Sequence, residues 1–594
     1  MKKTSFLVIV GILGFLQASC KLPDSGSFEE VLYERTHDKE LRSAVLGSLI
    51  YLNDRQIRDR EGVHSSEYDY CDPHSITPTC QSSVSLSLQL LGAEATINND
   101  VGEWANYIHL LPNPIVGGTS AGVFKIQDSN IFTTMSIIFP LFLFDESDIP
   151  ENERVIAPML HSAMSSIPKY KRDGSYGFYP RFDDGSENAE FVHAVNISEK
   201  FAEKFSTIYV DPNYDWMWKL IAQEGGLPSK DWVQEILDNP YGATAAPNTP
   251  SDADDTGVVV AAQKLYSRFY DENALDSYYK DESNFFVDID SLYELAKYRD
   301  MGRNEEDPRN TWREPDSGAF LTWLKDESLD TFSTPNTGVI PHGVNDVDCV
   351  VNANAVLAMS MTGHEDVAGF DDAIKLLVDV VANKKWEACG TYYPQKMMLP
   401  YVLTRAFRDG GANNPLLRDV MGILVKDILD EQLTLSRTNP FLAGAMPGGE
   451  DQSYHLSTAL GLNALLNIGR DIAEEAGVLA KYQVGVKKAV EYLLRSKKEA
   501  LVVNDSTFKS WSKTGQDKGY HWEGGIFFTN SFTKFVQWRS NAYTTAIVLE
   551  SLSKYLMAYD FDNTTLLEGR RIRMTSYTRD IDRADSGFNF TVTP

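Results

Sequence analysis

The chain has 594 residues, of which 43% are hydrophobic and 23% are charged, so it is long enough for a large core or for several domains. Its formal net charge is −29, spread along the chain, which makes nucleic acid a poor partner because phosphates are repelled. Neither the histidines nor the cysteines have zinc-site spacing, and no phosphate-binding or dinucleotide motif is present. We therefore predict neither a metal nor a cofactor.

The first 19 residues are typical of a signal peptide. Two lysines precede the apolar run 6–16, which is too short for a usual membrane span. The run ends in QASC, and small residues before Cys20 resemble a bacterial lipobox, although Gln17 replaces the usual aliphatic residue. We expect an exported, periplasmic or outer-membrane lipoprotein that reaches a membrane through a lipid on Cys20. Ordinary signal cleavage without lipidation is the alternative.

The remaining four cysteines agree with export. Cys71 and Cys80 enclose a short polar loop with two prolines, which favours a disulfide in an oxidising compartment. Cys349 and Cys389 are a second possible pair, and the sequence alone leaves their bonding open.

Most long periodic segments after residue 75 are predicted to be helical, and one kind recurs. It is apolar, rich in Ser, Thr and Ala, and follows a polar or acidic residue, so it should be packed closely on all sides. These segments are 78–91, 128–143, 252–266, 346–359, 450–466 and 538–552. Between them lie amphipathic helices with charged faces, at 372–381, 416–433 and 482–494.

Buried helices that alternate with amphipathic ones predict an all-α fold, namely an α/α toroid with an inner and an outer ring. Short aromatic-glycine turns recur at loose intervals, which favours divergent helical-hairpin repeats. A long helical solenoid is the main alternative. We assign the toroid to residues 76–560, a lipid-anchored tether with a first helix to 20–75, and an irregular tail to 561–594.

The acidic stretch at the start of segment 252–266 is the predicted functional site. Asp252, Asp254 and Asp255 stand where free backbone N–H groups and the helix dipole favour negative charge. If this helix lines a cavity, one of the three acids can be kept protonated and used as a general acid. Helix capping with surface charge, or calcium bound in a loop, is the alternative interpretation.

The residues Asp252-Ala253-Asp254-Asp255-Thr256 resemble the DxDD(T) motif of class II terpenoid cyclases, which include the squalene–hopene cyclases. The aromatic-glycine turns resemble the repeat loops of the wider terpenoid cyclase and prenyltransferase toroid group. The resemblance implies that Asp254 protonates an alkene or epoxide, that Asp252 and Asp255 flank it, and that aromatic faces stabilise the cations formed. The complete QW repeats of triterpene cyclases are not evident.

Other acidic and aromatic residues near the ends of predicted inner helices are candidates to line the same opening of the toroid as Asp254. Asp346 and Asp348 look like a degraded second copy of the acidic motif, and they can either fix loops or face a ligand. The predicted ligand-binding residues are Asp346, Asp348, Glu450, Asp451, Tyr454, Trp522, Glu523, Trp538 and Tyr543.

Three functions are compatible with the sequence. The first is a cyclase-like enzyme acting on an isoprenoid or lipid. The second is a glycosidase or polysaccharide lyase, because carboxylates with aromatic platforms also suit a glycan. The third is a non-catalytic ligand-binding lipoprotein. The GTSAG stretch at 118–122 matches the GxSxG pattern, but the chain lacks the strand and helix of a nucleophile elbow, so we interpret it as a loop.

Overall fold

The computed structural model describes part of the chain, in sixteen segments of very different length. The described residues are 28–57, 101–110, 124–128, 130–146, 154–172, 174–179, 249–272, 287–302, 316–325, 345–412, 414–434, 440–449, 453–500, 519–529, 536–559 and 573–574. The chain divides into two compact units, 1–43 and 44–594, and α2 (Phe28–Arg55) begins in the first. The functional site lies in the second unit.

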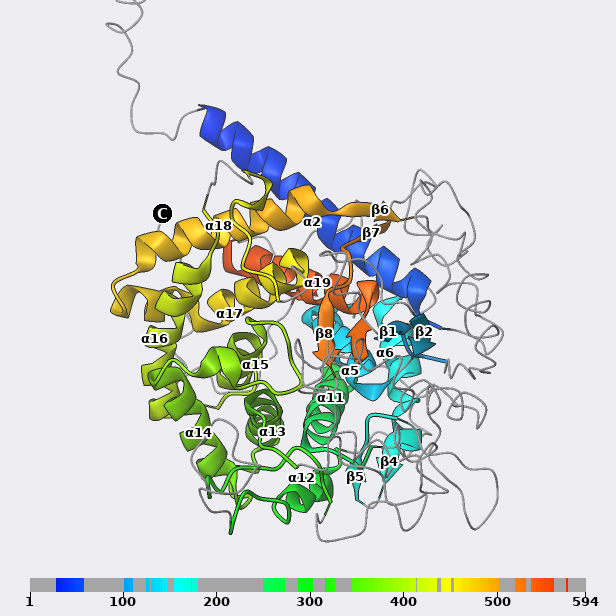
Figure 1. Cartoon of the computed structure of the whole chain (residues 1–594). Helices are drawn as coiled ribbons and strands as arrows, with labels where there is room; N and C mark the ends of the chain where they lie inside the picture. The colour runs from blue at the N-terminus through cyan, green and yellow to red at the C-terminus, as the bar shows by residue number, and fades with distance from the viewer. Residues whose placement is uncertain are drawn as a thin grey trace, which may run out of the picture. The chain divides into compact units, whose positions relative to one another are not determined.

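Six largely buried helices of the second unit form a closed cycle of contacts. Each helix in chain order touches the next, and the last touches the first (Figure 1). In order they are α5 (Ile131–Ile138), α11 (Ala253–Glu272), α13 (Cys349–Thr362), α15 (Met398–Arg408), α17 (Tyr454–Glu475) and α19 (Asn541–Tyr559). All eight residues of α5 are buried, as are the first eleven of α13, so neighbouring segments pack on every face of both.

Helices with only one buried face pack against this cycle. In Figure 1, α14 and α16 lie beyond α13 and α15, and the contacts agree, since α14 touches α13 and α16 touches both α15 and α17. These helices are α6 (Ile156–Met164), α12 (Ile289–Leu295), α14 (Phe370–Ala382), α16 (Pro415–Glu431) and α18 (Leu479–Ser496). The described part of the chain is therefore mostly helical, as the sequence predicts.

The structure also contains strands, so the prediction of an all-α fold is incomplete. An antiparallel sheet has the order β2-β1-β9-β8. Its strands are β1 (Asn106–Leu110), β2 (Phe124–Asp128), β8 (Ile526–Thr529) and β9 (Val536–Arg539). The strands are four or five residues long, and β1 pairs with β9 from the other end of the chain. Such short segments with a distant partner carry too little alternation to be recognised locally.

Short elements complete the described structure. Three two-residue or three-residue strand pairs are β3 (Phe144–Asp145) with β10 (Arg573–Met574), β4 (Lys171–Arg172) with β5 (Ser175–Tyr176), and β6 (Lys498–Ala500) with β7 (Gly519–His521). The 3₁₀ turns are η2 (Phe139–Leu143), η4 (Ile167–Tyr170), η7 (Trp386–Ala388) and η8 (Pro440–Leu442). Among the described helices, none combines the length and the apolar character needed to cross a bilayer.

Five of the six predicted buried segments coincide with described helices, while 78–91 lies outside the described residues. The structure adds α15, which the sequence pattern misses because its buried face carries Tyr401 and Arg405 rather than small apolar residues alone. A glycine sets the spacing of α11 and α13. A Cβ on Gly257 would lie 2.9 Å from the backbone oxygen of Asn354, so only glycine permits this approach.

Candidate functional site

A small pocket with a cavity volume of about 20 Å³ lies where α11 begins. Its lining combines three aspartates with six aromatic side chains that come from helices, strands and loops far apart in the sequence. The lining residues are Phe132, Phe178, Asp252, Asp254, Asp255, Thr322, Trp323, Val351, Tyr392, Tyr393 and Phe528. The acidic stretch predicted from the sequence therefore faces a pocket, not solvent.

Two neighbouring segments hold the start of α11. The backbone N–H of Asp252 donates to the carbonyl of Tyr176 at 3.0 Å, and Ala253 donates to Thr322 at 2.9 Å. Asp252 precedes the helix and accepts the backbone N–H of Asp255 through Oδ1 at 2.6 Å, as a capping residue does. The capping interpretation thus describes Asp252, but it does not describe the other two aspartates.

Asp252 and Asp255 behave as a coupled pair of carboxyl groups. Burial raises the pKa of Asp252 to about 6, and the hydrogen bond with Asp255 and the Arg172 guanidinium limit the rise. Burial raises the pKa of Asp255 well above its usual range, and the negative charge of Asp252 raises it further. Sharing one proton between the two groups is therefore favoured, because two carboxylates side by side cannot both ionise cheaply.

Asp254 is held by side chains alone. Its Oδ1 accepts a hydrogen bond from Nδ2 of Asn354 at 2.6 Å, and its Oδ2 is bonded by the hydroxyl of Tyr393. Only 5% of the residue is exposed. Burial raises the pKa of Asp254 well above its usual range and the charge of Asp252 adds to this, while the Asn354 hydrogen bond opposes it. This carboxyl group therefore keeps its proton to higher pH than an exposed aspartate does.

Aromatic rings form most of the remaining pocket wall. Phe528 of β8 stacks on Phe178 at 5.3 Å and on Tyr392 at 5.7 Å between ring centroids. Trp323 meets Tyr392 edge-on at 5.6 Å, and its Nε1 donates to the Tyr392 hydroxyl at 2.8 Å. Because each ring rests against another, the wall presents fixed π-faces to whatever enters the pocket.

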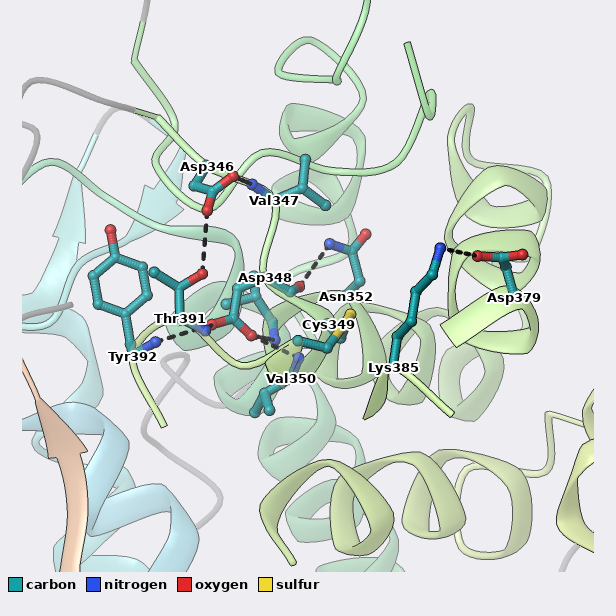
Figure 2. Close-up of a disulfide and its surroundings, with 12 residues drawn as sticks. Asp346, Val347, Asp348, Cys349, Val350, Asn352, Asp379, Lys385, Thr391 and Tyr392 are labelled. Atoms are coloured by element: carbon teal, nitrogen blue, oxygen red, sulfur yellow. Dashed lines mark hydrogen bonds and ion pairs between the residues drawn. A yellow bond between two sulfur atoms is a disulfide. The ribbon is translucent and has the colours of Figure 1, made fainter. Parts of the chain in front are cut away.

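The loop that carries Tyr392 and Tyr393 is tied to the start of α13, as Figure 2 shows. Oδ1 of Asp348 caps α13 by accepting the N–H groups of Val350 and Val351, and its Oδ2 accepts those of Thr391 at 2.5 Å and Tyr392 at 3.1 Å. Burial raises the pKa of Asp348 to about 6 against the effect of these four donors.

Two further links join the same loop to α13. The Thr391 hydroxyl donates to Oδ2 of Asp346 at 3.2 Å, and a disulfide joins Cys349 to Cys389 with their Cα atoms 5.6 Å apart. The disulfide that the sequence leaves open is therefore present. Asp346 and Asp348 do not line the pocket; their described partners lie in the protein, and a ligand-binding role for them stays a prediction.

The remaining predicted residues lie at different distances from the pocket. Tyr543 of α19 stacks on Phe527 at 4.4 Å, and its pKa is raised by burial and also by the charge of Asp254. Trp538 of β9 meets the pocket ring of Phe528 edge-on at 5.1 Å. Neither residue lines the pocket, but each contacts a ring that does, since Tyr543 also stacks on Phe132 at 6.3 Å.

Trp522, Glu523 and Tyr454 do not line the pocket. Trp522 is buried and its Nε1 donates to the carbonyl of Leu493 at 2.9 Å, while Glu523 is exposed and paired with Lys498. Glu450, Asp451, Cys20, Cys71 and Cys80 lie outside the described residues, so their predicted roles stay predictions. No group of three or more His, Cys, Asp or Glu within the described ranges has a geometry that could hold a metal ion.

The pocket also contains functional residues to which the sequence pattern assigns no role. The aromatic-glycine turns at 174–179, 316–323 and 390–393 indicate only repeat boundaries in the sequence, yet they supply Phe178, Trp323 and both tyrosines. Their recurrence is the available signal. No sequence signal marks Phe132 or Phe528, because a single phenylalanine in a buried helix or strand looks like any other core residue.

No family model matches the chain, and no curated protein matches it. A substituted form of the type II terpene cyclase MstE from Scytonema, without ligand, is 12% identical over 88% of this chain and 98% of that chain, with a TM-score of 0.40. A second form, with its substrate geranylgeranyl dihydroxybenzoate, is 13% identical over 79% and 95%, with a TM-score of 0.37.

A protein from Actinoplanes is 12% identical over 80% of this chain and 98% of that chain, with a TM-score of 0.35. At scores this low, the likenesses carry neither a fold nor a function across to this chain. Its function has to be inferred from the residues of its own pocket.

Proposed function

We propose that the protein is a protonation-initiated, cyclase-like enzyme that acts on an isoprenoid or lipid, with Asp254 as the general acid, inside an α/α toroid. The observation that carries the proposal is a buried carboxyl group with a raised pKa at an aromatic-walled pocket. The closed cycle of contacts from α5 to α19 supports the toroid. The DxDD(T)-like residues 252–256 agree with the proposed role.

The proposed reaction begins when Asp254 gives its proton to a terminal alkene or epoxide of the substrate. Protonation of an alkene forms a carbocation, and protonation of an epoxide opens the ring to an alcohol with a carbocation beside it. A neighbouring alkene then attacks the carbocation and forms a carbon–carbon bond. The last cation then loses a proton to a base, and Asp254 regains one from solvent. Protons therefore balance, and cyclisation of an alkene is an isomerisation.

The pocket provides what each of these steps requires. Asn354 and Tyr393 stay bonded to Asp254 after it loses its proton, so the carboxylate is stabilised without water. The faces of Phe178, Tyr392 and Phe528 can stabilise cationic carbon. Burial has a useful consequence, since it keeps the proton in place until a substrate arrives.

The test is turnover by Asp254→Asn with a panel of linear isoprenoids that end in an alkene or an epoxide. We expect a loss of about 10²- to 10⁴-fold, as for the removal of a general acid. Asp300→Asn is a matched control, because Asp300 is equally buried but binds Ser317 through its side-chain oxygen Oδ2, away from the pocket. Unchanged turnover in Asp254→Asn would remove Asp254 from the mechanism.

A carbohydrate-active enzyme is the second candidate, because Trp323 and Tyr392 next to three carboxyl groups also resemble a platform for a sugar ring. Against it, the described lining of the pocket has only Thr322, Trp323 and two tyrosines as polar side chains beside the aspartates, and the Trp323 N–H already donates to Tyr392, which leaves few groups for a ligand covered in hydroxyls. Cleavage or binding in a glycan screen would favour this candidate. Copurification of a lipid without any turnover would favour a binding lipoprotein.

We also propose that the protein is exported and lipid-anchored through Cys20. The signal-like residues 1–19 motivate the proposal, and the Cys349–Cys389 disulfide supports an oxidising compartment. Metabolic labelling with a radioactive fatty acid should mark the wild type and not Cys20→Ser. Equal labelling of both, or none in either, would exclude lipidation at this cysteine.

A further inference from the structure

Arg405 stands behind the proposed acid and contacts it through one intermediate. The arginine lies on α15 and is 2% exposed, and its Nη2 donates to Oδ1 of Asn354 at 2.8 Å. Nδ2 of the same amide donates to Oδ1 of Asp254 at 2.6 Å. Three side chains from α15, α13 and α11 are therefore connected in series.

The chemistry of the guanidinium group decides how the amide is turned. Arginine has only donors, so the oxygen of Asn354 must face Arg405, and its NH₂ group must face Asp254. An amide is otherwise free to present either end to a protonated carboxyl group, which can both donate and accept. Arg405 removes that freedom.

The fixed amide in turn decides which oxygen of Asp254 carries the proton. Oδ1 of Asp254 accepts the N–H of Asn354. If Oδ1 carried the proton of the carboxyl group, two hydrogen-bond donors would face each other. Oδ2 is the oxygen to which the hydroxyl of Tyr393 donates. Because that hydroxyl can turn and accept instead, Oδ2 is the oxygen that can carry the proton. A tyrosine hydroxyl can accept from the acid and donate to the carboxylate, so it suits both states of Asp254.

We propose that Arg405 is a positioning residue, which locks the amide of Asn354 and thereby confines the transferable proton of Asp254 to Oδ2, beside Tyr393 at the pocket. The catalytic consequence rests on the function proposed above. The choice between the two oxygens does not, because it depends on the hydrogen bonds alone.

The surroundings of Arg405 hold it in this place. Its guanidinium carbon lies 4.4 Å from the ring centroid of Phe139 and 5.0 Å from that of Tyr401. Its Nη1 donates to the hydroxyl of Tyr401 at 3.2 Å, which donates to Glu550 at 2.6 Å. Glu550 also pairs with Lys554 at 2.8 Å, and Lys554 pairs with Asp409 at 2.6 Å, so the buried arginine is part of a network with two positive and two negative side chains.

Charged and titratable groups act on Asp254 from several described elements, while α5 contributes none. They are Asp252 and Asp255 beside it, Asp348 at the start of α13, Arg405 on α15, Tyr393 in the loop before α15 and Tyr543 on α19, with Arg172 acting on the first two. Asp252 and Asp348 raise the pKa of Asp254, and Arg405 lowers it. Loss of the arginine should therefore make Asp254 a weaker acid.

Neutron diffraction from deuterium-exchanged wild-type crystals tests the arrangement without a variant or a substrate. We expect a deuteron on Oδ2 of Asp254, none on Oδ1, and the ND₂ group of Asn354 directed at Asp254. A deuteron on Oδ1, or an inverted amide, would overturn the inference. This result also decides the matter if variants at Arg405 fail to fold.

Two substitutions, Arg405→Gln and Arg405→Lys, separate the effects of charge and hydrogen-bond orientation from the effect of side-chain size. Glutamine is neutral and can turn either end to Asn354, while lysine keeps a positive, donor-only group. The readout is the pKa of the Asp254 carboxyl, followed through its infrared band, with Asp254→Asn as the spectral baseline. We expect Arg405→Gln to raise this pKa by about one unit or more and Arg405→Lys to raise it much less.

Arg408→Gln is the matched control, because Arg408 lies on the same helix but donates to the carbonyls of Asn467 and Ile468. It should leave the pKa of Asp254 unchanged. A folded Arg405→Gln variant with an unshifted pKa would overturn the inference.

With an active substrate, Arg405→Gln should lower kcat about three- to tenfold with little change in KM, and Arg405→Lys should restore most of it. A shifted pKa without any isoprenoid turnover would sink the proposed function and leave the positioning role intact.

Discussion

The starts of α11 and α13 both carry aspartates, and their chemistry differs because their partners differ. Oδ1 and Oδ2 of Asp348 each accept two backbone N–H groups, which makes the carboxylate part of the scaffold. Asp254 accepts no backbone N–H in the described structure and is bonded by Asn354 and Tyr393 instead. Backbone donors favour a charged, structural carboxylate, while burial beside other acids favours a protonated, reactive one.

The disulfide at the α13 side offers the largest expected effect. Cys349 and Cys389 are 40 residues apart, and a cross-link over such a loop stabilises a protein by about 3 to 4 kcal/mol. We expect the double substitution to serine to lower the free energy of unfolding by about that amount, measured by urea denaturation. A wild-type value that does not change on reduction would contradict this expectation.

Asp348→Asn and Asp254→Asn sharpen the comparison directly. Asparagine can still cap α13 with its oxygen, but its NH₂ would face the N–H groups of Thr391 and Tyr392, and we expect a loss of about 2 kcal/mol. At position 254 asparagine mimics a protonated carboxyl group, so the loss should stay below about 1 kcal/mol. Thermal unfolding of both variants at one pH is the measurement. Equal losses would mean that the two aspartates do the same work.

The start of α11 can be recognised in the sequence and the aromatic wall cannot, for physical reasons. The start of α11 is readable because its carboxylates, small residues and apolar run are contiguous. The aromatic wall is not, because Phe178, Tyr392 and Phe528 meet only after distant segments have packed together. The four-stranded sheet is not predicted for the same reason, because its paired strands β1 and β9 come from opposite ends of the chain.

Arg405 illustrates a second limit of sequence reasoning. Its helix, α15, lacks the small-residue pattern of the other buried helices, and a buried arginine within it resembles a surface residue until its partners are known. The closed cycle of contacts supplies those partners, because it brings α15 against α13. Residue pattern can identify a helix start, but the second layer behind a site depends on the packing.

Gly257→Ala tests whether close packing of α11 on α13 positions the acid. The new Cβ would lie 2.9 Å from the backbone oxygen of Asn354, so the helices must separate, at a cost of about 1 to 2 kcal/mol. Gly422 on α16 is the matched control, because its new Cβ would meet its nearest atom, Ala476 Cβ, at 3.9 Å. Alanine there should stabilise the helix by about 0.5 to 1 kcal/mol. Opposite signs in thermal denaturation are the expected result, and a tolerated Gly257→Ala would show that the spacing has slack.

The pH dependence of stability tests the pair of carboxyl groups at the start of α11. The pKa of Asp255 is raised in the folded protein, so the folded state binds the extra proton and stability falls as pH rises from about 4 through the folded pKa. Asparagine at position 255 stays neutral at every pH. Asp255→Asn should therefore lose less stability than the wild type between pH 4 and 7, by about 1.4 kcal/mol for each unit of pKa difference removed. Urea denaturation at both pH values measures this, and parallel curves for the two proteins would mean that Asp255 is ionised and that the pair at the start of α11 does not share a proton.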